Sequence, residues 1–302
     1  MTYYHVDGEV VPAEEARVSV EDRGFRYGDA AFETLRAYGG DLFEWEAHAD
    51  RLANTCEAIG IDHGLSETDL RSRIEETLEA NELEDAYVRL SITRGTQVGT
   101  LAPLPDVDPT VVVIVDDLPR GGTDGRSVWD DPAKVEISTV QRIPDRAIPA
   151  RAKTHNYLGG VLARLDRPDA DEALLLDADG YLTEGTVSNL FFVRDGSLHT
   201  PSVDGPVLPG ITRSVVLGLA YERGMPVETG RYALGDLLTA DEAFLTNTTW
   251  EIRPIASVDG EALGDEALTP ARIERSSNDE SVTAQLIRDF DRLIEREFYE
   301  KH

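Results

Sequence analysis

Apolar and polar residues alternate in several short runs over the first 115 residues, and two stretches of helical period lie between these runs. Alternation with a period of two predicts strands, and two pairs of runs are separated by the turn signals Asp7-Gly8 and Gly39-Gly40. The predicted strands cover residues 3–6, 9–12, 32–38, 41–45, 86–93 and 110–115. One predicted helix ends at Gly60, and a second begins at Ser66.

The remainder of the chain mixes the same two patterns. Strands are predicted at residues 135–140, 173–176 and 189–194, helices at 156–167 and 211–223, and an amphipathic helix near the C-terminus. Residues 116–128 are polar and rich in Gly and Asp, which is typical of a linker. Clustered strands with scattered helices predict an α+β fold. We expect a small N-terminal domain at 1–115, a linker at 116–128 and a larger C-terminal domain at 129–302.

The amino-acid composition limits the possible partners and cellular location of the protein. The chain carries 58 acidic and 29 basic residues, and its net charge of −29 is spread along its length. Because nucleic acid is also negative, we expect no nucleic-acid partner. Such an acid excess is typical of a halophilic protein from a high-salt cytoplasm, where screening reduces self-repulsion. The N-terminus does not resemble a signal peptide and no apolar run could cross a bilayer, so we expect a cytoplasmic protein without membrane contact. The single cysteine, Cys56, excludes an internal disulfide.

Lysine is rare in this chain, with three among 302 residues. Lys134 and the penultimate Lys301 fit solvated surface positions, whereas Lys153 lies among polar and aromatic residues in the run from Arg151 to Leu158. An amine can lose its proton and form a Schiff base, which a guanidinium cannot. Lys153 is therefore the candidate nucleophile.

Three further segments complete a possible cofactor site. Glu184 places a carboxylate where a turn meets a strand, and Thr248 follows an apolar strand. Gly210-Ile211-Thr212 begins a helix, whose free backbone N–H groups and dipole favour an anion. An amine, a carboxylate and an anion-binding helix start are what pyridoxal 5′-phosphate requires for its aldehyde, its pyridine nitrogen and its phosphate. Each feature alone has an ordinary structural explanation, so the prediction depends on their combination.

The chain also resembles a known family, the fold-type IV pyridoxal-phosphate enzymes or class IV aminotransferases, from about residue 3 to residue 260. The resemblance rests on motifs in consistent order: Asp22-Arg23-Gly24-Phe25-Arg26-Tyr27-Gly28-Asp29, Phe32-Glu33-Thr34-Leu35-Arg36, His48-Ala49-Asp50-Arg51-Leu52, Lys153-Thr154-His155-Asn156-Tyr157, Glu184-Gly185-Thr186-Val187-Ser188-Asn189-Leu190-Phe191 and Gly210-Ile211-Thr212-Arg213. It implies a small N-terminal α/β domain, a larger C-terminal domain with a β-barrel-like core, and a homodimer or higher homo-oligomer.

The resemblance also implies roles for single residues. Lys153 would bind the cofactor covalently and act as the catalytic acid and base, and Glu184 would pair with the pyridine nitrogen. The residues implied around the phosphate are Arg51, Ile211, Thr212 and Thr248, and Tyr157 would lie near the phenolic oxygen. The residues implied on the substrate side are Tyr27, Phe32, Thr34, Arg36, Tyr87, Arg89, Thr249 and Trp250. No metal site is expected.

The substrate is less well defined. Tyr87-Val88-Arg89 resembles the strand that binds the substrate carboxylate in branched-chain aminotransferases, which favours branched-chain-like L-amino acids and a 2-oxo acid as substrates. Thr34, however, stands where those enzymes usually have Gly. The alternatives are an aminodeoxychorismate lyase that releases pyruvate and 4-aminobenzoate, a D-amino-acid aminotransferase, and a non-enzymatic acidic binding protein. Donor, acceptor and stereopreference stay open.

Overall fold

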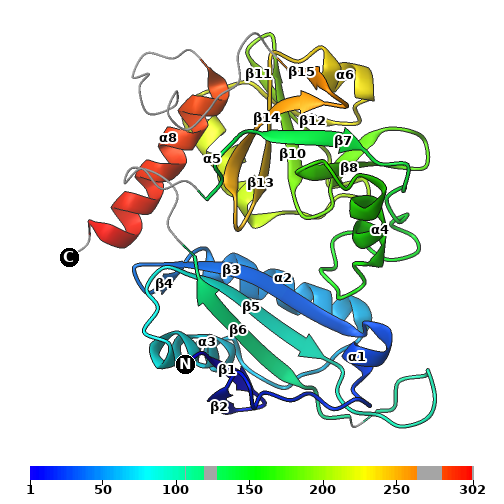
Figure 1. The fold of residues 1–302 in the computed structure, drawn as a ribbon, viewed down its shortest axis with the longest axis vertical. Coiled ribbons are helices and arrows are strands. Elements are labelled where there is room, and N and C mark those ends of the chain that lie inside the picture. The colour runs from blue at the N-terminus through cyan, green and yellow to red at the C-terminus, as the bar shows by residue number, and fades with distance from the viewer. Residues whose placement is uncertain (106, 119–127, 264–280, 301–302) are drawn as a thin grey trace. The chain divides into compact units, whose positions relative to one another are not determined.

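The structure is a computed structural model that describes residues 1–105, 107–118, 128–263 and 281–300 (Figure 1). The chain divides into two compact units. The first comprises Met1–Leu118 and Ala152–Asn156, and the second Pro119–Arg151 and Tyr157–His302. The segment Ala152–Asn156 thus packs with the first unit, although its position falls within the predicted C-terminal domain. The predicted linker overlaps a strand at residues 116–117, and its residues 119–127 lie outside the described residues.

An antiparallel sheet forms the first unit, in the strand order β2-β1-β6-β5-β3-β4. Its strands are β1 (Tyr3–Val6), β2 (Glu9–Pro12), β3 (Ala30–Tyr38), β4 (Asp41–Leu42), β5 (Ala86–Thr93) and β6 (Val111–Asp117). The predicted Asp7-Gly8 turn joins β1 to β2, with φ of 50° and 101° at the two residues. The predicted strand at 41–45 is wrong beyond Leu42, because Glu44 adopts φ 52° and directs the chain into a helix at Trp45.

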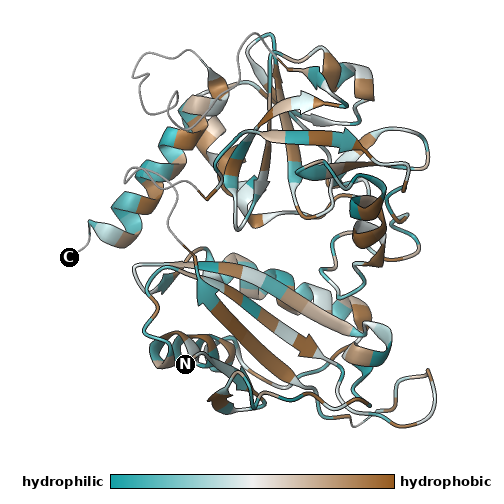
Figure 2. Cartoon of the chain, in the orientation of Figure 1, coloured by the Kyte–Doolittle hydropathy of each residue, from teal (hydrophilic) through white to brown (hydrophobic). Residues whose placement is uncertain are grey.

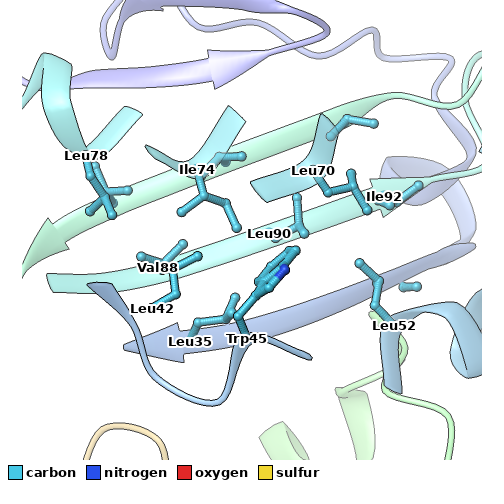
Figure 3. Packing of buried hydrophobic residues seen from close by; sticks show 14 of the residues in the cluster. Leu35, Leu42, Trp45, Leu52, Leu70, Ile74, Leu78, Val88, Leu90 and Ile92 are labelled. Carbon is cyan, nitrogen blue, oxygen red and sulfur yellow. The ribbon is translucent and has the colours of Figure 1, made fainter. Parts of the chain in front are cut away.

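Two helices, α2 (Trp45–Ile59) and α3 (Glu67–Ala80), pack against one face of this sheet. Figure 3 shows Leu70, Ile74 and Leu78 of α3 facing Val88 and Leu90 of β5. Full burial of one such side chain contributes about 1.5–3 kcal/mol.

The predicted helix boundaries have clear local causes. Ser66 forms a capping box with Asp69, and Gly60 ends α2 with φ 66°. Cys56 is buried, and burial raises the pKa of its thiol to about 11, so it is an inert core residue. A short helix that the pattern did not predict, α1 (Arg23–Tyr27), begins at Asp22, whose side chain accepts a hydrogen bond from Gly24 N.

The second unit contains a longer sheet in the order β12-β11-β10-β13-β14-β7-β8-β9, with β15 paired to β14. Its strands are β7 (Ala133–Ile137), β8 (Glu172–Leu176), β9 (Leu182–Gly185), β10 (Asn189–Arg194), β11 (Ser197–Pro201), β12 (Val227–Gly230), β13 (Glu242–Asn247), β14 (Glu251–Val258) and β15 (Glu261–Ala262). The edge strand β9 also lies beside β10, which follows it by a tight turn, so the sheet curls back on itself. The strand predicted at 135–140 forms two residues earlier in the chain.

The helices of the second unit are α4 (Leu158–Asp166), α5 (Ile211–Glu222), α6 (Leu234–Leu238) and α8 (Val282–Ile294), which continues into one π-helical turn (Glu295–Tyr299). The predictions of α5 and of the C-terminal amphipathic helix are confirmed, and Leu286 and Phe290 are buried. α4 begins two residues later than predicted, because residues 153–155 are held in an extended conformation. None of the described helices has the length and apolar character needed to cross a membrane.

Candidate active site

Lys153 is attached to the first unit by its main chain. Phe32 N donates a hydrogen bond to Lys153 O at 3.0 Å, and His155 N donates to Ala30 O at 3.0 Å, so this segment pairs with the start of β3. Lys153 N donates in turn to Thr55 Oγ1 of α2 at 3.1 Å. The Lys153 ammonium lies 4.5 Å from the centre of the Phe32 ring. Strand and helix together therefore fix the base of this side chain.

The predicted substrate residues of the first unit, except Tyr27, share one face of β3 and β5. The register pairs Thr34 with Arg89 and Arg36 with Tyr87, and directly opposed residues point to the same side of a sheet. The expectation that Tyr87 and Arg89 lie on one strand, with side chains on one face, is confirmed. Arg89 is half-buried, its guanidinium lies 3.9 Å from the centre of the Phe32 ring, and it forms no ion pair with any residue that the structure describes.

His155 borders the same face. Its ring packs edge-on against Phe32, and Nε2 lies 3.2 Å from Ser91 Oγ. Burial and the charge of Arg89 lower the pKa of His155 to about 4. The imidazole is therefore neutral near pH 7, and the positive charge on this face comes from arginine and lysine.

Arg51 lies on the opposite side of β3, where α2 packs. Its Nε and Nη2 donate to the two carboxylate oxygens of Glu33, at 2.8 and 2.5 Å, and His48 Nδ1 lies 2.8 Å from Glu33 Oε2. Burial raises the pKa of Glu33, but the charge of Arg51 and the hydrogen bonds outweigh it and lower that pKa to about 2. The predicted phosphate ligand is thus held by a buried, ionised carboxylate.

Glu184 of β9 is a carboxylate that accepts hydrogen bonds from several neighbouring groups. Arg142 Nε donates to Oε1 at 2.8 Å, while Leu208 N and Asn189 Nδ2 donate to Oε2 at 2.9 and 3.3 Å. All three groups favour the ionised carboxylate. A negative group of this kind fits a protonated pyridine nitrogen.

The turn between Glu184 and Asn189 rests on another buried carboxylate, Glu172 of β8. Glu172 accepts hydrogen bonds from Thr186 Oγ1 (2.5 Å), Ser188 Oγ (2.8 Å), Val187 N (3.2 Å) and its neighbour Ala173 N (2.9 Å). It is fully buried and pairs with no cation among the described residues. Hydrogen bonds alone therefore offset the cost of burying it.

The start of α5 has the character of an anion site. Gly210 is the N-cap and offers no side-chain cap to the first N–H groups of the helix, and Thr212 and Arg213 are buried there. A Cβ at Gly210 would meet Asn189 Oδ1 at 2.0 Å, so only glycine fits this approach. Burial lowers the pKa of the Arg213 guanidinium. The backbone N–H groups of the helix start and the Thr212 hydroxyl form a donor set that fits a phosphate, whereas the Arg213 guanidinium donates to Thr200 Oγ1 and Pro201 O of β11.

The remaining predicted site residues lie in turns and at helix ends. Thr248 and Thr249 are in the turn after β13, and Tyr157 directly precedes α4. Trp250 is partly buried against Trp129 and Ala284, with the Arg253 guanidinium 5.1 Å from its ring centre. Tyr27 ends α1 outside the strand face, where its ring contacts Arg23 and Arg26.

A separate cavity of about 1090 Å³ lies in the first unit, lined by residues that include Asp7, His63, Arg73 and Gln97, and it contains none of the predicted site residues. The described residues hold no cluster of side chains suited to a metal ion.

Sequence reasoning missed the residues that hold these groups in place: Glu33, His48, Thr55, Arg142, Glu172 and Asn189. For Glu33 a signal was available, because a carboxylate interrupts the apolar face of a strand between Ala31 and Leu35. Arg142 and Glu172 carry no such local signal, since their partners lie 42 and 14–16 residues away.

Comparison with known proteins identifies the family of this chain. Residues 30–258 match the family Amino-transferase class IV. A Methanocaldococcus jannaschii protein, provisionally named a branched-chain-amino-acid aminotransferase, is 38% identical over 263 residues, which is 86% of this chain and 89% of that protein. The D-alanine aminotransferase of Listeria monocytogenes is 34% identical over 267 residues, with the same two shares covered.

A solved structure gives the same result for the fold. The branched-chain amino acid aminotransferase from Thermobaculum terrenum, solved in its PLP-form, has a TM-score of 0.81 and 28% identity, covering 97% of this chain and 94% of that one. The predicted fold class, that of the fold-type IV enzymes, is confirmed by this similarity. With a family match over residues 30–258 and relatives of this identity and coverage, the chain belongs to the class IV aminotransferase family.

Proposed function

We propose that this chain uses pyridoxal 5′-phosphate to move an amino group between an amino acid and a 2-oxo acid, with branched-chain L-amino acids as preferred donors. Family membership and the PLP-form of a similar enzyme support the cofactor. The observation that carries the proposal is Lys153, fixed beside Phe32 while Arg89 lies against the same ring. An amine nucleophile and a half-buried cation without an ion pair among the described residues are what an amino-acid substrate requires.

The chemistry is divided between two residues. The bound cofactor supplies an aldehyde carbon and an electron-withdrawing ring. Lys153 would hold the cofactor covalently through Nζ, and the same amine would act as base and then as acid for the proton on the substrate Cα. Glu184 would keep a proton on the pyridine nitrogen, and the hydrogen bonds it accepts from Arg142, Asn189 and Leu208 N favour the carboxylate form that this requires.

The remaining cofactor residues bind and orient. Arg51, Ile211, Thr212 and Thr248 hold the phosphate through a guanidinium, the N–H groups of a helix start and hydroxyls. The uncapped start of α5 and the buried hydroxyl of Thr212 support this assignment. Tyr157, which directly precedes α4, would lie near the phenolic oxygen of the ring.

Arg89 binds the substrate carboxylate with Tyr87 beside it, through charge-assisted hydrogen bonds. Phe32, Thr34 and Arg36 form the same face of the sheet, which supports their place around the substrate. The other proposed substrate residues are Tyr27, Thr249 and Trp250. Trp250 also packs on Trp129, so part of its role is structural.

D-Amino acids are the second candidate class of donor, because D-alanine aminotransferases are 34% identical to this chain. A donor screen at high salt decides between them. L-Leucine, L-valine, L-isoleucine and D-alanine are each paired with 2-oxoglutarate and with pyruvate, beside an assay for 4-aminobenzoate. Turnover of the L-branched donors supports the proposal. Turnover of D-alanine alone, or release of 4-aminobenzoate, would replace it.

The proposal also includes a homodimer and a high-salt environment for the protein. Four large apolar residues of α4 are exposed on one side of the helix: Leu158, Val161, Leu162 and Leu165. Figure 2 shows the apolar character of α4. Such a stripe is typical of a surface that a partner covers, which supports a homodimer. The net charge of −29 supports a halophilic protein that works in a high-salt cytoplasm.

A further inference from the structure

Glu33 is a carboxylate on the apolar face of a strand. Side chains alternate along β3, so Glu33 points to the same side as Ala31, Leu35 and Ala37, which belong to the hydrophobic core of the first unit. Its relative exposure is 1%. A charge in such a place costs free energy unless it is paired and hydrogen-bonded. The partners of Glu33 therefore explain how the position is tolerated.

Those partners come from α2. Arg51 donates through Nε and Nη2 to both carboxylate oxygens, and His48 Nδ1 lies within hydrogen-bond distance of one of them. Because Glu33 is ionised and can only accept, His48 must donate from Nδ1. A guanidinium is planar and rigid, so fixing two of its nitrogens also fixes the direction of the third. Glu33 thus determines how Arg51 is presented.

We propose that Glu33 is a positioning residue that orients Arg51 toward the phosphate of the cofactor. The inference rests on the phosphate role proposed above for Arg51. Charge alone would act in the opposite direction, since a carboxylate beside an anion site repels phosphate. Any benefit of Glu33 to phosphate binding must therefore come from its orientation of Arg51. If charge repulsion dominates, removing the Glu33 charge strengthens phosphate binding; if orientation dominates, the same change weakens it.

Two variants of Glu33 separate charge from orientation. Glu33→Gln keeps the shape but removes the charge and replaces one acceptor oxygen by a donor. Glu33→Asp keeps the charge but is one methylene shorter, so it cannot hold the guanidinium in the same place. Cofactor-free protein is titrated with pyridoxal 5′-phosphate and with pyridoxal, which lacks the phosphate. Asp50→Asn is the matched control, because it removes an exposed charge next to Arg51 in the same helix.

We expect both Glu33 variants to bind pyridoxal 5′-phosphate at least about tenfold more weakly. Their affinity for pyridoxal should stay within about twofold of the native protein, as should Asp50→Asn for both ligands. Unchanged or tighter phosphate binding by Glu33→Gln, or native affinity in Glu33→Asp, would overturn the proposal. Equal losses for both ligands would also overturn it, because a purely structural role affects both alike. If Glu33→Gln does not fold, Glu33→Asp decides.

Arg51→Ala separates this inference from the proposed function. If Arg51→Ala weakens pyridoxal 5′-phosphate binding but the Glu33 variants do not, only the role of Glu33 is wrong. If Arg51→Ala binds the cofactor as the native protein does, the phosphate role of Arg51 is wrong, and the inference falls with it. Turnover of L-branched donors then tests the aminotransferase activity independently of either residue.

Discussion

Lys153 and Phe32 make two contacts, one through the main chain and one through the side chains. The Phe32 amide donates a hydrogen bond to the Lys153 carbonyl at 3.0 Å, and the Lys153 ammonium lies 4.5 Å from the centre of the Phe32 ring. An ammonium over an aromatic face gains about 0.5–2 kcal/mol. The position of the amine is therefore set by β3, the strand that also carries Thr34 and Arg36 opposite Arg89 and Tyr87.

Replacing Arg89 should affect substrates rather than the cofactor. In Arg89→Ala we expect KM for amino acids and 2-oxo acids to rise roughly 10- to 100-fold, since a charge-assisted hydrogen bond contributes about 1.5–3 kcal/mol. The absorption spectrum of the bound cofactor should stay unchanged, and a neutral amine without a carboxylate should lose much less. Steady-state kinetics with both kinds of donor measure this, with the exposed Arg71→Ala as control. Equal losses for both kinds would make Arg89 a structural strand residue.

Removing the cation beside Glu184 should slow the chemical step. In Arg142→Ala the carboxylate loses its 2.8 Å ion pair, while Leu208 N and Asn189 still donate to it. We expect kcat to fall by about tenfold or more, with smaller changes in cofactor retention, because the phosphate residues are untouched. The control is Arg231→Ala, which removes exposed ion pairs with Asp177 and Asp179. A native kcat in Arg142→Ala would exclude this role.

Glu172→Gln should destabilise the second unit. The hydroxyls and main-chain amides around this carboxylate all donate to it, so an amide nitrogen must face a donor at one position. We expect the free energy of unfolding to fall by about 1–3 kcal/mol, as for a buried group left unsatisfied. Urea unfolding of the cofactor-free protein measures it, compared with the exposed Glu222→Gln. Equal midpoints for the two variants would contradict the structural role of Glu172.

Acid should destabilise the first unit partly through His155. Its pKa is about 4 in the folded protein and ordinarily 6.5, so the unfolded chain binds the proton first as pH falls. The contribution of His155 to stability is fully present above pH 6.5 and is lost as pH falls toward 4. Urea midpoints at about pH 7 and about pH 5, at constant salt, should therefore differ more for the native protein than for His155→Gln. The same difference in both proteins would show that His155 does not titrate in this window.

Local signals predicted much of the fold. The Asp7-Gly8 turn, the Ser66 capping box and Gly60 each act within a few residues, and the structure has them where the pattern places them. Glu44 shows the limit of such signals. Its positive φ ends a predicted strand, and nothing in its side chain requires that conformation.

The sequence alone could suggest the candidate site where a single residue type has a distinctive chemical property. Lys153 and the uncapped helix start at Gly210 have this character. The groups that orient them are set by tertiary packing: Thr55 holds the main chain of Lys153 across 98 residues, and Arg142 reaches Glu184 across 42. Contacts between residues so far apart in the chain leave no local sequence pattern. Glu33 differs from these residues, because its charge interrupts the apolar face of a strand and could have been noticed in the sequence.

The most direct test of the account is borohydride reduction of the protein loaded with pyridoxal 5′-phosphate, followed by peptide mapping. Reduction fixes a covalent link between an amine and the cofactor, and the chain offers three lysines to carry it. We expect the adduct on Lys153 alone, with loss of turnover in Lys153→Ala. An adduct on Lys134 or Lys301, or full turnover in Lys153→Ala, would contradict the assignment of Lys153 as the nucleophile.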